Sequence, residues 1–544
     1  MSDAKALIAR GEKLFADKSS LDSFHQELAD NFYPERGLFT NELMLGEDFA
    51  SKLQTSYPIL VRRDLGNAFG SMLRPRDKEW FHTSVYDDDK LSRTAKSWLE
   101  MATHRQRKAM YDRHSGFVRA TKEGDHDFAT FGQCVIQPDW DWNENRLLYL
   151  TWHLKDCAWV EDYTGAVGEF YRRWNPTATQ LARRFPKNGA LHKNVTDKLT
   201  KDPHGKVRCL CVAIPAASYD TDKKWRQKWM HVIVDVENQH IIDEVNRSRM
   251  GYVVPRWQTV SGAQYAYSPA AVAGLPDARL IQAMTLTLLE AGEMAVRPPL
   301  VATKDAIRED VQWYPGGVTW ADVDYDQRTG RVLEPIYQEK NGLPFGMEIA
   351  QDIRAMLSTA FYLNKISLPP NVNAGQMTAY EAGQRVQEYI REAVPLFEPM
   401  ESEYNGALCE DTFEILQGVG LFGPPEDMPR ELSRREVRFE FESPLHEAIK
   451  RKKGITFLEA KGLLTEAAQL DKASVATLDA RKALRDALDG VGTPADWLND
   501  EEAVEAYAEQ LEAQQQAAMA TAAVDAGATA AEQLGKAGQA LKAA

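Results

Sequence analysis

Three aspartates alternate in the stretch ADVDYDQ, at Asp322, Asp324 and Asp326, and carboxylates in such a pattern are potential ligands for Mg²⁺ or Ca²⁺. A calcium-binding loop would need a glycine at its sixth position and a glutamate at its end, and Arg328 interrupts this stretch instead. We therefore favour an exposed acidic segment over a metal site. A metal-dependent nuclease is the alternative function that these three residues would support.

Two cysteines and two histidines are the other candidates for chemistry. Cys209 and Cys211 are two residues apart and share one strand face, but a zinc site needs a second ligand pair at a suitable spacing. His104 and His114 flank a basic segment, and no partner carboxylate for acid–base catalysis can be assigned to them. We expect buried strand cysteines, and histidines on the solvated face of a helix.

Sequence motifs of common enzymes are absent. A phosphate-binding loop ends in Gly-Lys-Ser or Gly-Lys-Thr, and the Gly-Lys pair at 535–536 is followed by alanine. Neither the Gly-x-Ser-x-Gly turn of serine hydrolases nor the His-Glu-x-x-His zinc motif occurs. The sequence therefore argues against an ATP-driven motor and predicts no enzymatic activity, no catalytic residue and no cofactor.

The densest basic run is IKRKKG at 449–454, which contains Lys450, Arg451, Lys452 and Lys453. Adjacent cations of this kind can contact DNA phosphates. They can equally form the solvated side of a helix whose inner side is apolar. The sequence leaves both interpretations open.

Composition excludes several classes of protein. A chain of 544 residues is too long for one ordinary core, and its 44% hydrophobic residues are enough to bury large ones. The net charge of −15 argues against a protein that grips DNA with its whole surface. Five cysteines without regular spacing suit a reducing cytoplasm, and the sequence contains no secretory signal and no apolar run of bilayer-spanning length.

The first half of the chain predicts helices followed by strands. Residues 1–33 predict two helices divided near Ser19-Ser20 and ended by Pro34, and residues 55–118 predict helices with a loop at 72–85. From 128 to 260 the pattern is typical of strands, with a hairpin that turns at Glu237-Asn238 and one helix at 175–185.

A long helix follows at 268–296. Ser268 and Pro269 are suited to be its N-cap and first helical residue, since a serine oxygen accepts a free amide and proline has none. Pro276 and Asp277 repeat that signal. We expect two turns with defined directions, then a helix whose apolar face carries the spaced residues Leu280, Ile281, Met284, Leu288 and Leu289.

The second half of the chain is mainly helical. The pattern predicts strand and loop at 297–330, a helix at 344–364 and a polar loop at 365–376. It then predicts a long helix at 377–418, bent at Pro395 or Pro399, a strand at 437–445, and helices up to an Ala-rich tail after 501. This mixture of separate helical and strand segments indicates an α+β fold.

Six segments occur in an order that matches a known family. They are GSMLRPRDKEWF (70–81), EFYRRWNPTATQLARRF (169–185), YSPAAVAGLPDARLI (267–281), RPPLV (297–301), MTAYEAGQRVQE (377–388) and ESPL (442–445). From about residue 20 to residue 500 the chain resembles the bacteriophage head-to-tail connecting proteins, the portal proteins of short-tailed phages. One departure is Tyr380-Glu381, where the family usually has Thr-Glu.

The resemblance implies an organisation of the subunit. It comprises a wing (1–266), a first stem helix (267–296), a clip (297–343), a second stem helix (344–364), a tunnel loop (365–376), a return to the wing with a long bent helix and a strand (377–442), crown helices (443–500) and a tail or barrel helix (501–544). The tunnel loop would present Lys365, Asn371, Asn373 and Gln376 to DNA. The clip would present Arg308, Glu309, Asp310, Asp322, Asp324 and Asp326 to partner proteins.

The resemblance also implies the function. Such proteins form a ring, commonly of twelve copies, at one vertex of the capsid, after assembly in the host cytoplasm. Double-stranded DNA enters and leaves through the ring. The implied partners are the large terminase subunit, the tail adaptor or tube, the major capsid and scaffolding proteins and core or ejection proteins, with no membrane. Two alternatives are an enzyme of phage DNA processing, such as a terminase subunit or a metal-dependent nuclease that uses Asp322, Asp324 and Asp326, and another phage structural protein, such as a tail adaptor.

The charge pattern agrees with a channel. DNA that slides must break each strong phosphate contact, so a channel should not attract phosphate strongly. Residues 304–348 contain five basic and nine acidic residues, and the tunnel loop carries one charge, on Lys365. We hypothesise that Ser268-Pro269 and Pro276-Asp277 set the angle between wing and stem, so that replacing Pro276 by alanine harms ring assembly or packaging.

Overall fold

The chain forms two compact units in the computed structural model. The structure describes residues 3–296 with short gaps, 300–302, 333–335, 342–366, 400–441 with short gaps, and short stretches between 457 and 514. One unit comprises residues 1–80 and 105–421, and the other comprises residues 81–104 and 422–544. All strand pairs are antiparallel and the helices occupy separate segments, so the predicted α+β class is confirmed.

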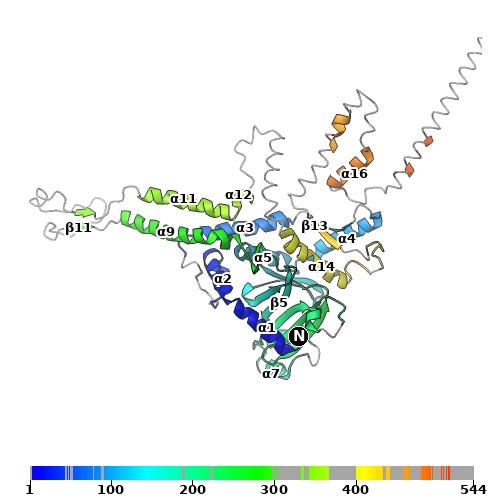
Figure 1. The fold of residues 1–544 in the computed structure, drawn as a ribbon, viewed down its shortest axis with the longest axis horizontal. Coiled ribbons are helices and arrows are strands. Elements are labelled where there is room, and N and C mark those ends of the chain that lie inside the picture. The colour runs from blue at the N-terminus through cyan, green and yellow to red at the C-terminus, as the bar shows by residue number, and fades with distance from the viewer. Residues whose placement is uncertain are drawn as a thin grey trace, which may run out of the picture. The chain divides into compact units, whose positions relative to one another are not determined.

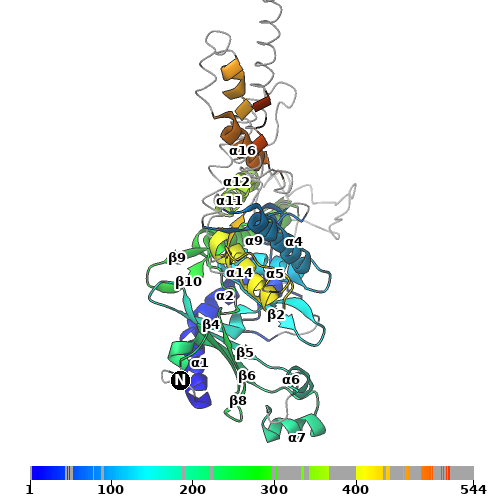
Figure 2. The ribbon, with the colours of Figure 1, turned by 90° about the vertical axis from the view of Figure 1, so that its right-hand side faces the viewer.

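The first unit contains a five-stranded antiparallel sheet in the order β4-β5-β6-β7-β8 (Figure 2). Its strands are β4 (Cys157–Glu161), β5 (Val167–Trp174), β6 (Cys209–Pro215), β7 (Trp229–Asp235) and β8 (His240–Arg247). The hairpin predicted to turn at Glu237-Asn238 is confirmed, because β7 and β8 flank this turn. A short helix, α8 (Ala216–Tyr219), follows β6.

Helices cover both faces of this sheet. Helix α1 (Ala4–Asp17) packs on one face, where alternate residues of β6, such as Leu210 and Val212, meet Leu7 and Leu14. Helices α6 (Ala178–Arg184) and α7 (Lys193–Lys201) cover the other face with a smaller cluster around Val195. The period of two along a strand therefore places two separate cores on the two faces.

The N-terminal helices agree with the sequence prediction. Helix α1 ends at Asp17 and α2 (Ser19–Phe32) follows directly, with η1 (Pro34–Arg36) after it. The division lies at Lys18, whose buried ammonium donates to the carbonyl oxygen of Cys157 at 2.8 Å. Helix α6 lies within the predicted helix at 175–185 and begins with a capping box, because Thr177 and Gln180 bond each other's backbone amides.

A helical layer completes the first unit. It contains α3 (Tyr57–Leu73), α5 (Phe117–Phe131) and α14 (Ala407–Gly418), together with the hairpin of β2 (Val135–Asp141) and β3 (Arg146–Trp152). The short elements η3 (Leu154–Asp156), β9 (Gln258–Val260) and β10 (Ala263–Tyr267) connect these parts to the sheet. Every residue of α5 from Gly124 to Phe131 is buried, so this helix is central to the layer.

A pair of helices extends from this layer (Figure 1). The π-helical turn η4 (Ala270–Gly274) leads into α9 (Leu275–Val296), and α11 (Gly342–Ala360) returns beside it and is followed by α12 (Leu363–Ile366). Two short strands that pair with each other, β11 (Leu300–Ala302) and β12 (Leu333–Pro335), are the described residues between these helices. Ile353 and Leu357 of α11 and Phe361 directly after it are buried, whereas Met356 is 48% exposed.

The second unit is built on a strand pair between distant parts of the sequence. Strand β1 (Phe81–Val85) pairs with β13 (Val437–Phe441), so that Thr83 lies opposite Phe439. The strand at β13 was predicted, whereas the predicted loop over 72–85 is wrong from Phe81 onward. Helix α16 (Ala480–Val491) belongs to this unit, and α4 (Arg93–Met110) contributes residues to both units.

Candidate functional site

The chain enters the α9–α11 pair at the C-terminal end of α5. Gly132 caps α5 with a positive φ of 76°. A Cβ atom at this position would lie 2.5 Å from the carbonyl carbon of Tyr267 and 2.7 Å from the amide nitrogen of Ser268. The strand that leads into α9 therefore crosses α5 at a point where only a glycine leaves room.

Ser268 fixes this crossing with two hydrogen bonds. Its hydroxyl donates to the carbonyl oxygen of Thr130 at 2.6 Å and accepts from the amide of Ala271 at 3.0 Å. The side chain is fully buried. Ser268 is thus the N-cap that the sequence predicts, and it also satisfies a carbonyl near the end of α5.

A π-helical turn separates this N-cap from α9. The amide of Leu275 donates to the carbonyl oxygen of Ala270, five residues earlier. Two aromatic rings pack closely on Gly274, the last residue of this turn. A Cβ at Gly274 would lie 2.9 Å from the ring of Phe361 and 3.2 Å from that of Phe32. Rings from α2 and from the end of α11 therefore hold the base of the pair.

Pro276 and Asp277 do not begin a second helix, so the prediction of two separate turns is wrong. Both residues lie in the first turn of α9, which continues from η4 without a break. Proline lacks the amide that an interior helical residue would donate. The wide π turn directly before Pro276 accommodates that missing bond within one continuous helix.

Gln282 connects α9 to the segment before α3. Its side-chain oxygen accepts from the amides of Gln54 at 2.7 Å and Thr55 at 3.0 Å, and its nitrogen donates to the carbonyl oxygen of Thr55 at 2.9 Å. One turn earlier, Arg279 forms an ion pair with Glu27 of α2. The first turns of α9 are therefore fixed to two N-terminal segments.

Buried charged groups tie α5 to the neighbouring helices. Arg62 of α3 donates to Nδ1 of His126 at 3.2 Å and to the carbonyl oxygen of Phe32 at 3.0 Å. Burial, together with the positive charge of Arg62, lowers the pKa of His126 to about 4, so its imidazole is neutral and can accept this bond.

The next residue of α5, Asp127, pairs with Arg36 at 2.7 Å. Its side chain is fully buried, and burial raises its pKa to about 6 although Arg36 opposes that rise. The contact joins η1 to the centre of the helical layer. Removing either partner would leave an uncompensated buried charge, which is strongly destabilising.

A second π-helical segment, η5 (Met400–Gly406), contacts the same part of α5, around Gly124 and Asp125. Arg74 donates to Asn405 at 2.8 Å and pairs with Asp125 of α5. A Cβ at Gly124 would lie 2.8 Å from the hydroxyl of Tyr404. Helix α5 therefore contacts the start of α9 at one end and the segment before α14 along its middle.

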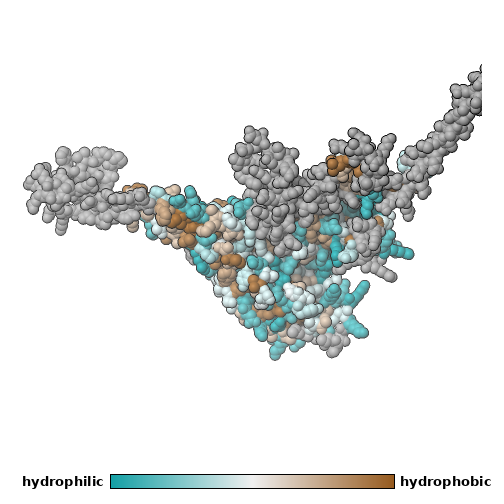
Figure 3. Space-filling view, turned by 45° about the horizontal axis from the view of Figure 1, so that its top comes forward, coloured by the Kyte–Doolittle hydropathy of each residue, from teal (hydrophilic) through white to brown (hydrophobic). Residues whose placement is uncertain are grey.

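The α9–α11 pair leaves apolar side chains uncovered on two sides of α9. Leu280 and Met294 are 49% and 50% exposed, and Leu286 and Leu289 are 43% and 55% exposed. The spacing of 100° per residue places the first two on one side and the other two on the opposite side of the contact with α11. The prediction that Leu280 and Leu289 belong to the packed face is therefore wrong for the single chain. Figure 3 shows apolar side chains gathered over this pair.

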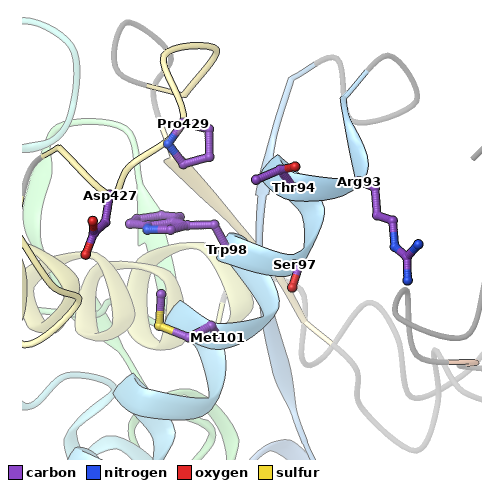
Figure 4. Close-up of a pocket in the computed structure, with 7 residues that line it drawn as sticks. All are labelled: Arg93, Thr94, Ser97, Trp98, Met101, Asp427 and Pro429. Atoms are coloured by element: carbon purple, nitrogen blue, oxygen red, sulfur yellow. The ribbon is translucent and has the colours of Figure 1, made fainter.

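The second unit contains an open hollow of about 440 Å³ (Figure 4). Trp98, Met101 and Pro429 give it an apolar wall, and Asp427 and Thr94 lie at its rim. Its lining contains no cysteine, no histidine and a single carboxylate. This set of side chains lacks a nucleophile paired with a base.

Cys209 and Cys211 are buried, as predicted. Burial raises the pKa of Cys209, so it remains a protonated thiol, and Cys211 accepts a contact of 3.3 Å from Arg172. Within the described ranges no group of three His, Cys, Asp or Glu side chains could hold a metal ion. None of the helices in that part of the chain is long and apolar enough to cross a bilayer.

The structure places few of the other predicted site residues. Ser268, Pro269, Pro276 and Asp277 lie together at the base of α9. Lys365 lies in α12, so the residue predicted to begin a loop belongs to a helix. The remaining predicted site residues lie outside the described residues: Arg308, Glu309, Asp310, Asp322, Asp324, Asp326, Asn371, Asn373, Gln376, Lys450, Arg451, Lys452 and Lys453.

Sequence reasoning missed the residues of α5 that receive these contacts. Gly132 directly after the helical residues Ala129-Thr130-Phe131 is a C-cap signal that could have been found. The run Asp125-His126-Asp127 gives no such signal, because the partners of these residues are far away in the sequence. Arg74 lies 51 residues from Asp125, Arg62 lies 64 residues from His126, and Arg36 lies 91 residues from Asp127.

Known proteins match nearly the whole length of this chain in sequence. The chain is 25% identical to the "Probable portal protein" of Bordetella phage BPP-1 over 464 residues, which cover 82% of this chain and 80% of that protein. It is 20% identical to the "Portal protein" of Salmonella phage epsilon15 over 532 residues, which cover 96% of this chain and 93% of that protein. A sequence model described as bacteriophage head to tail connecting protein matches residues 4–498. The chain therefore belongs to the bacteriophage head-to-tail connecting protein family.

Proposed function

We propose that this chain is the portal of its phage: a subunit of a closed ring of twelve copies at one vertex of the capsid, through which double-stranded DNA passes. The names of the two relatives support the class of protein. The observation that carries the proposal is the α9–α11 pair, whose uncovered apolar side chains lie on two sides of α9.

Two different apolar sides favour a ring over a dimer. A two-fold dimer buries one patch against its own copy, whereas a ring buries one side of each subunit against a different side of the next. Leu280 and Met294 supply one side, and Leu286 and Leu289 supply the other. The charged residues Arg279 and Glu290 lie between the two sides by helical spacing, where they stay in contact with water.

Within this ring, α9 and α11 are the stem that surrounds the channel. Residues 297–343 are the clip and 365–376 the tunnel loop, while the sheet and its helices form the wing and residues 443–500 the crown. The contacts of Ser268, Gly132 and Gln282 then set the direction of the stem relative to the wing. A stem fixed at its base can keep its two sides in register with both neighbours.

The charge of the subunit suits a channel in which DNA slides. Each copy carries a net charge of −15, and the stretch over 304–348 contributes four of those negative charges. Strong phosphate contacts would have to be broken at every step of movement, so a lining with few cations favours passage.

The partners follow from the position of the ring. We propose that the clip binds the large terminase subunit during packaging and a tail adaptor or tube afterwards. The wing meets the major capsid and scaffolding proteins, and the crown meets core or ejection proteins. The protein acts as a conduit and has no enzymatic role in this scheme.

Electron microscopy of the purified full chain tests the proposal. Class averages viewed down the axis should show rings with a central hole as wide as a DNA duplex. A uniform monomer or compact dimer that persists at high protein concentration would contradict it.

A further inference from the structure

A compact basic segment lies in the wing, between β5 and β6. Residues 175–208 contain eight arginines and lysines and two aspartates, a net charge of +6 within a chain of net charge −15. Helices α6 and α7, of 7 and 9 residues, are the helical parts of this segment. They lie beyond the sheet, at the part of the first unit remote from α9 and α11 (Figures 1 and 2).

The segment is a folded scaffold for its charges. The amide of Ala178 donates to the carbonyl oxygen of Gly205 at 3.1 Å, and that of Val207 donates to the carbonyl oxygen of Pro176 at 2.9 Å, so its two ends are joined. Val195 of α7 is buried against the sheet. The cations on its surface therefore have a fixed backbone beneath them.

Three of its lysines are free to meet a partner. Lys193, Lys201 and Lys206 are exposed and form no ion pair with any residue that the structure describes. Arg183 is 74% exposed and its nearest carboxylate, that of Glu144, is 3.8 Å away. We call the surface of Arg183, Lys193, Lys201 and Lys206 the basic wing surface.

The chemistry of this surface fits a phosphate backbone. A protein interface usually has aromatic or aliphatic anchors at its centre. Among the described residues of 175–208 there is no exposed large apolar side chain. Cations beside neutral hydrogen-bonding groups, such as Asn194 and Thr200, are the set that positions a protein on the backbone of a duplex.

We propose that the basic wing surface binds double-stranded DNA outside the channel, through its phosphates and without regard to sequence. The inference rests on the proposed function for the source of the DNA, because a portal lies where the packaged genome surrounds it. The acidic remainder of the chain repels DNA. DNA is therefore bound only at the basic wing surface, on the outer wing, and is not held in the channel.

The test compares duplex binding by the full chain and by the triple variant K193E/K201E/K206E. Fluorescence anisotropy with a duplex of about 30 base pairs and arbitrary sequence gives the affinity. Repeating the measurement at several salt concentrations gives the salt dependence of the affinity. We expect at least a tenfold loss of affinity and a slope of log K against log salt that is shallower by about 2 to 3. The control is K5E/K13E/K122E, which makes the same charge change at three exposed lysines elsewhere.

Three outcomes would overturn the proposal: equal affinity of the wild type and the triple variant, an equal loss in the control, or binding of polyglutamate as tight as that of the duplex. The last would assign the surface to an acidic protein. If the charge-reversed variant misfolds, K193Q/K201Q/K206Q replaces it, with a smaller loss of affinity expected. Ring formation is scored separately by microscopy, so wild-type rings without this DNA preference would reject the inference and leave the proposed function standing.

Discussion

The hydroxyl of Ser268 donates to the carbonyl oxygen of Thr130 at 2.6 Å and so joins the start of α9 to the end of α5. Alanine at 268 would remove this bond and the cap on Ala271, and leave a buried carbonyl unpaired. We expect the free energy of unfolding to fall by about 1–3 kcal/mol. Urea unfolding followed by tryptophan fluorescence measures it. Ser23→Ala, at an exposed serine of α2, is the control, and an equal effect of both variants would contradict the role of Ser268.

Gly132 should tolerate no side chain. Gly132→Ala would place a Cβ 2.5 Å from the backbone of Tyr267 at a φ of +76°, so backbone as well as side chains must move. We expect a loss of more than about 3 kcal/mol, or no soluble protein. Gly165→Ala has a similar φ of +79° with nothing within 4 Å, and should cost only about 1–2 kcal/mol. Equal thermal midpoints for the two variants would refute the steric argument.

Asp411 of α14 should make the protein less stable as the pH rises. Burial raises its pKa to about 7, against the opposing charge of Arg249 and with help from Glu414 and Glu410. The folded state therefore binds a proton that the unfolded state has released, between pH 4 and 7. The contribution of the protonated Asp411 side chain to the free energy of unfolding is fully present below pH 4 and is lost as the pH rises through 7.

Asp411→Asn mimics the protonated side chain and tests this. Relative to the wild type, its free energy of unfolding should be unchanged near pH 4 and higher by about 2–4 kcal/mol at pH 8. Urea titrations at pH 4.5, 6 and 8 measure the difference. Asp17→Asn, at an exposed aspartate of α1, should show no such trend, and a constant difference across pH for Asp411→Asn would count against burial as the cause.

The two apolar sides of α9 should be needed for assembly. L280E/M294E puts two carboxylates on one side, where a neighbouring subunit would bury them without partners. We expect folded single subunits in place of rings, by mass photometry and electron microscopy. Val118→Glu, at a valine of α5 that is also 50% exposed, is the control for added charge. Rings of unchanged yield from L280E/M294E would exclude this side of α9 as a subunit contact.

Pro276→Ala should reduce assembly by another route. Alanine supplies the amide that proline lacks, and so allows the π turn before α9 to relax toward a regular α-helix. One residue of change rotates the rest of α9 by about 100°, which would turn its two apolar sides away from the neighbours. We expect a lower yield of rings with a folded subunit. Pro344→Ala, at the exposed start of α11, is the control, and rings in wild-type amount from Pro276→Ala would contradict this view of the π turn.

Local rules made much of this fold predictable. The capping box at Thr177, the N-cap at Ser268 and the turn between β7 and β8 each depend on residues within a few positions of one another. The short apolar run of β6 likewise predicts a strand from its own residues. The order of such segments was enough to indicate the family.

Contacts between distant residues were not predictable. The sequence predicts a loop where β1 lies, because the partner strand β13 is more than 350 residues away. Nor does the sequence around Asp127 indicate its pair with Arg36 of η1. Leu280 and Leu289 follow the helical period of a packed face, yet the structure leaves them exposed. Helical spacing shows that apolar residues share a face of the helix. It does not show which part of the same chain, or which neighbouring subunit, covers that face.

The sequence by itself determined most of the element types, the helix start at Ser268 and the order of the elements, because these depend on short-range sterics and hydrogen bonds. The tertiary structure alone decided that the segment leading into α9 crosses α5 at Gly132. It also decided that the π turn joins the helix start at Ser268 and the one expected at Pro276 into one continuous helix. It also decided where the basic wing surface lies. These features arise from packing between segments far apart in the chain, whose free energy no local pattern contains.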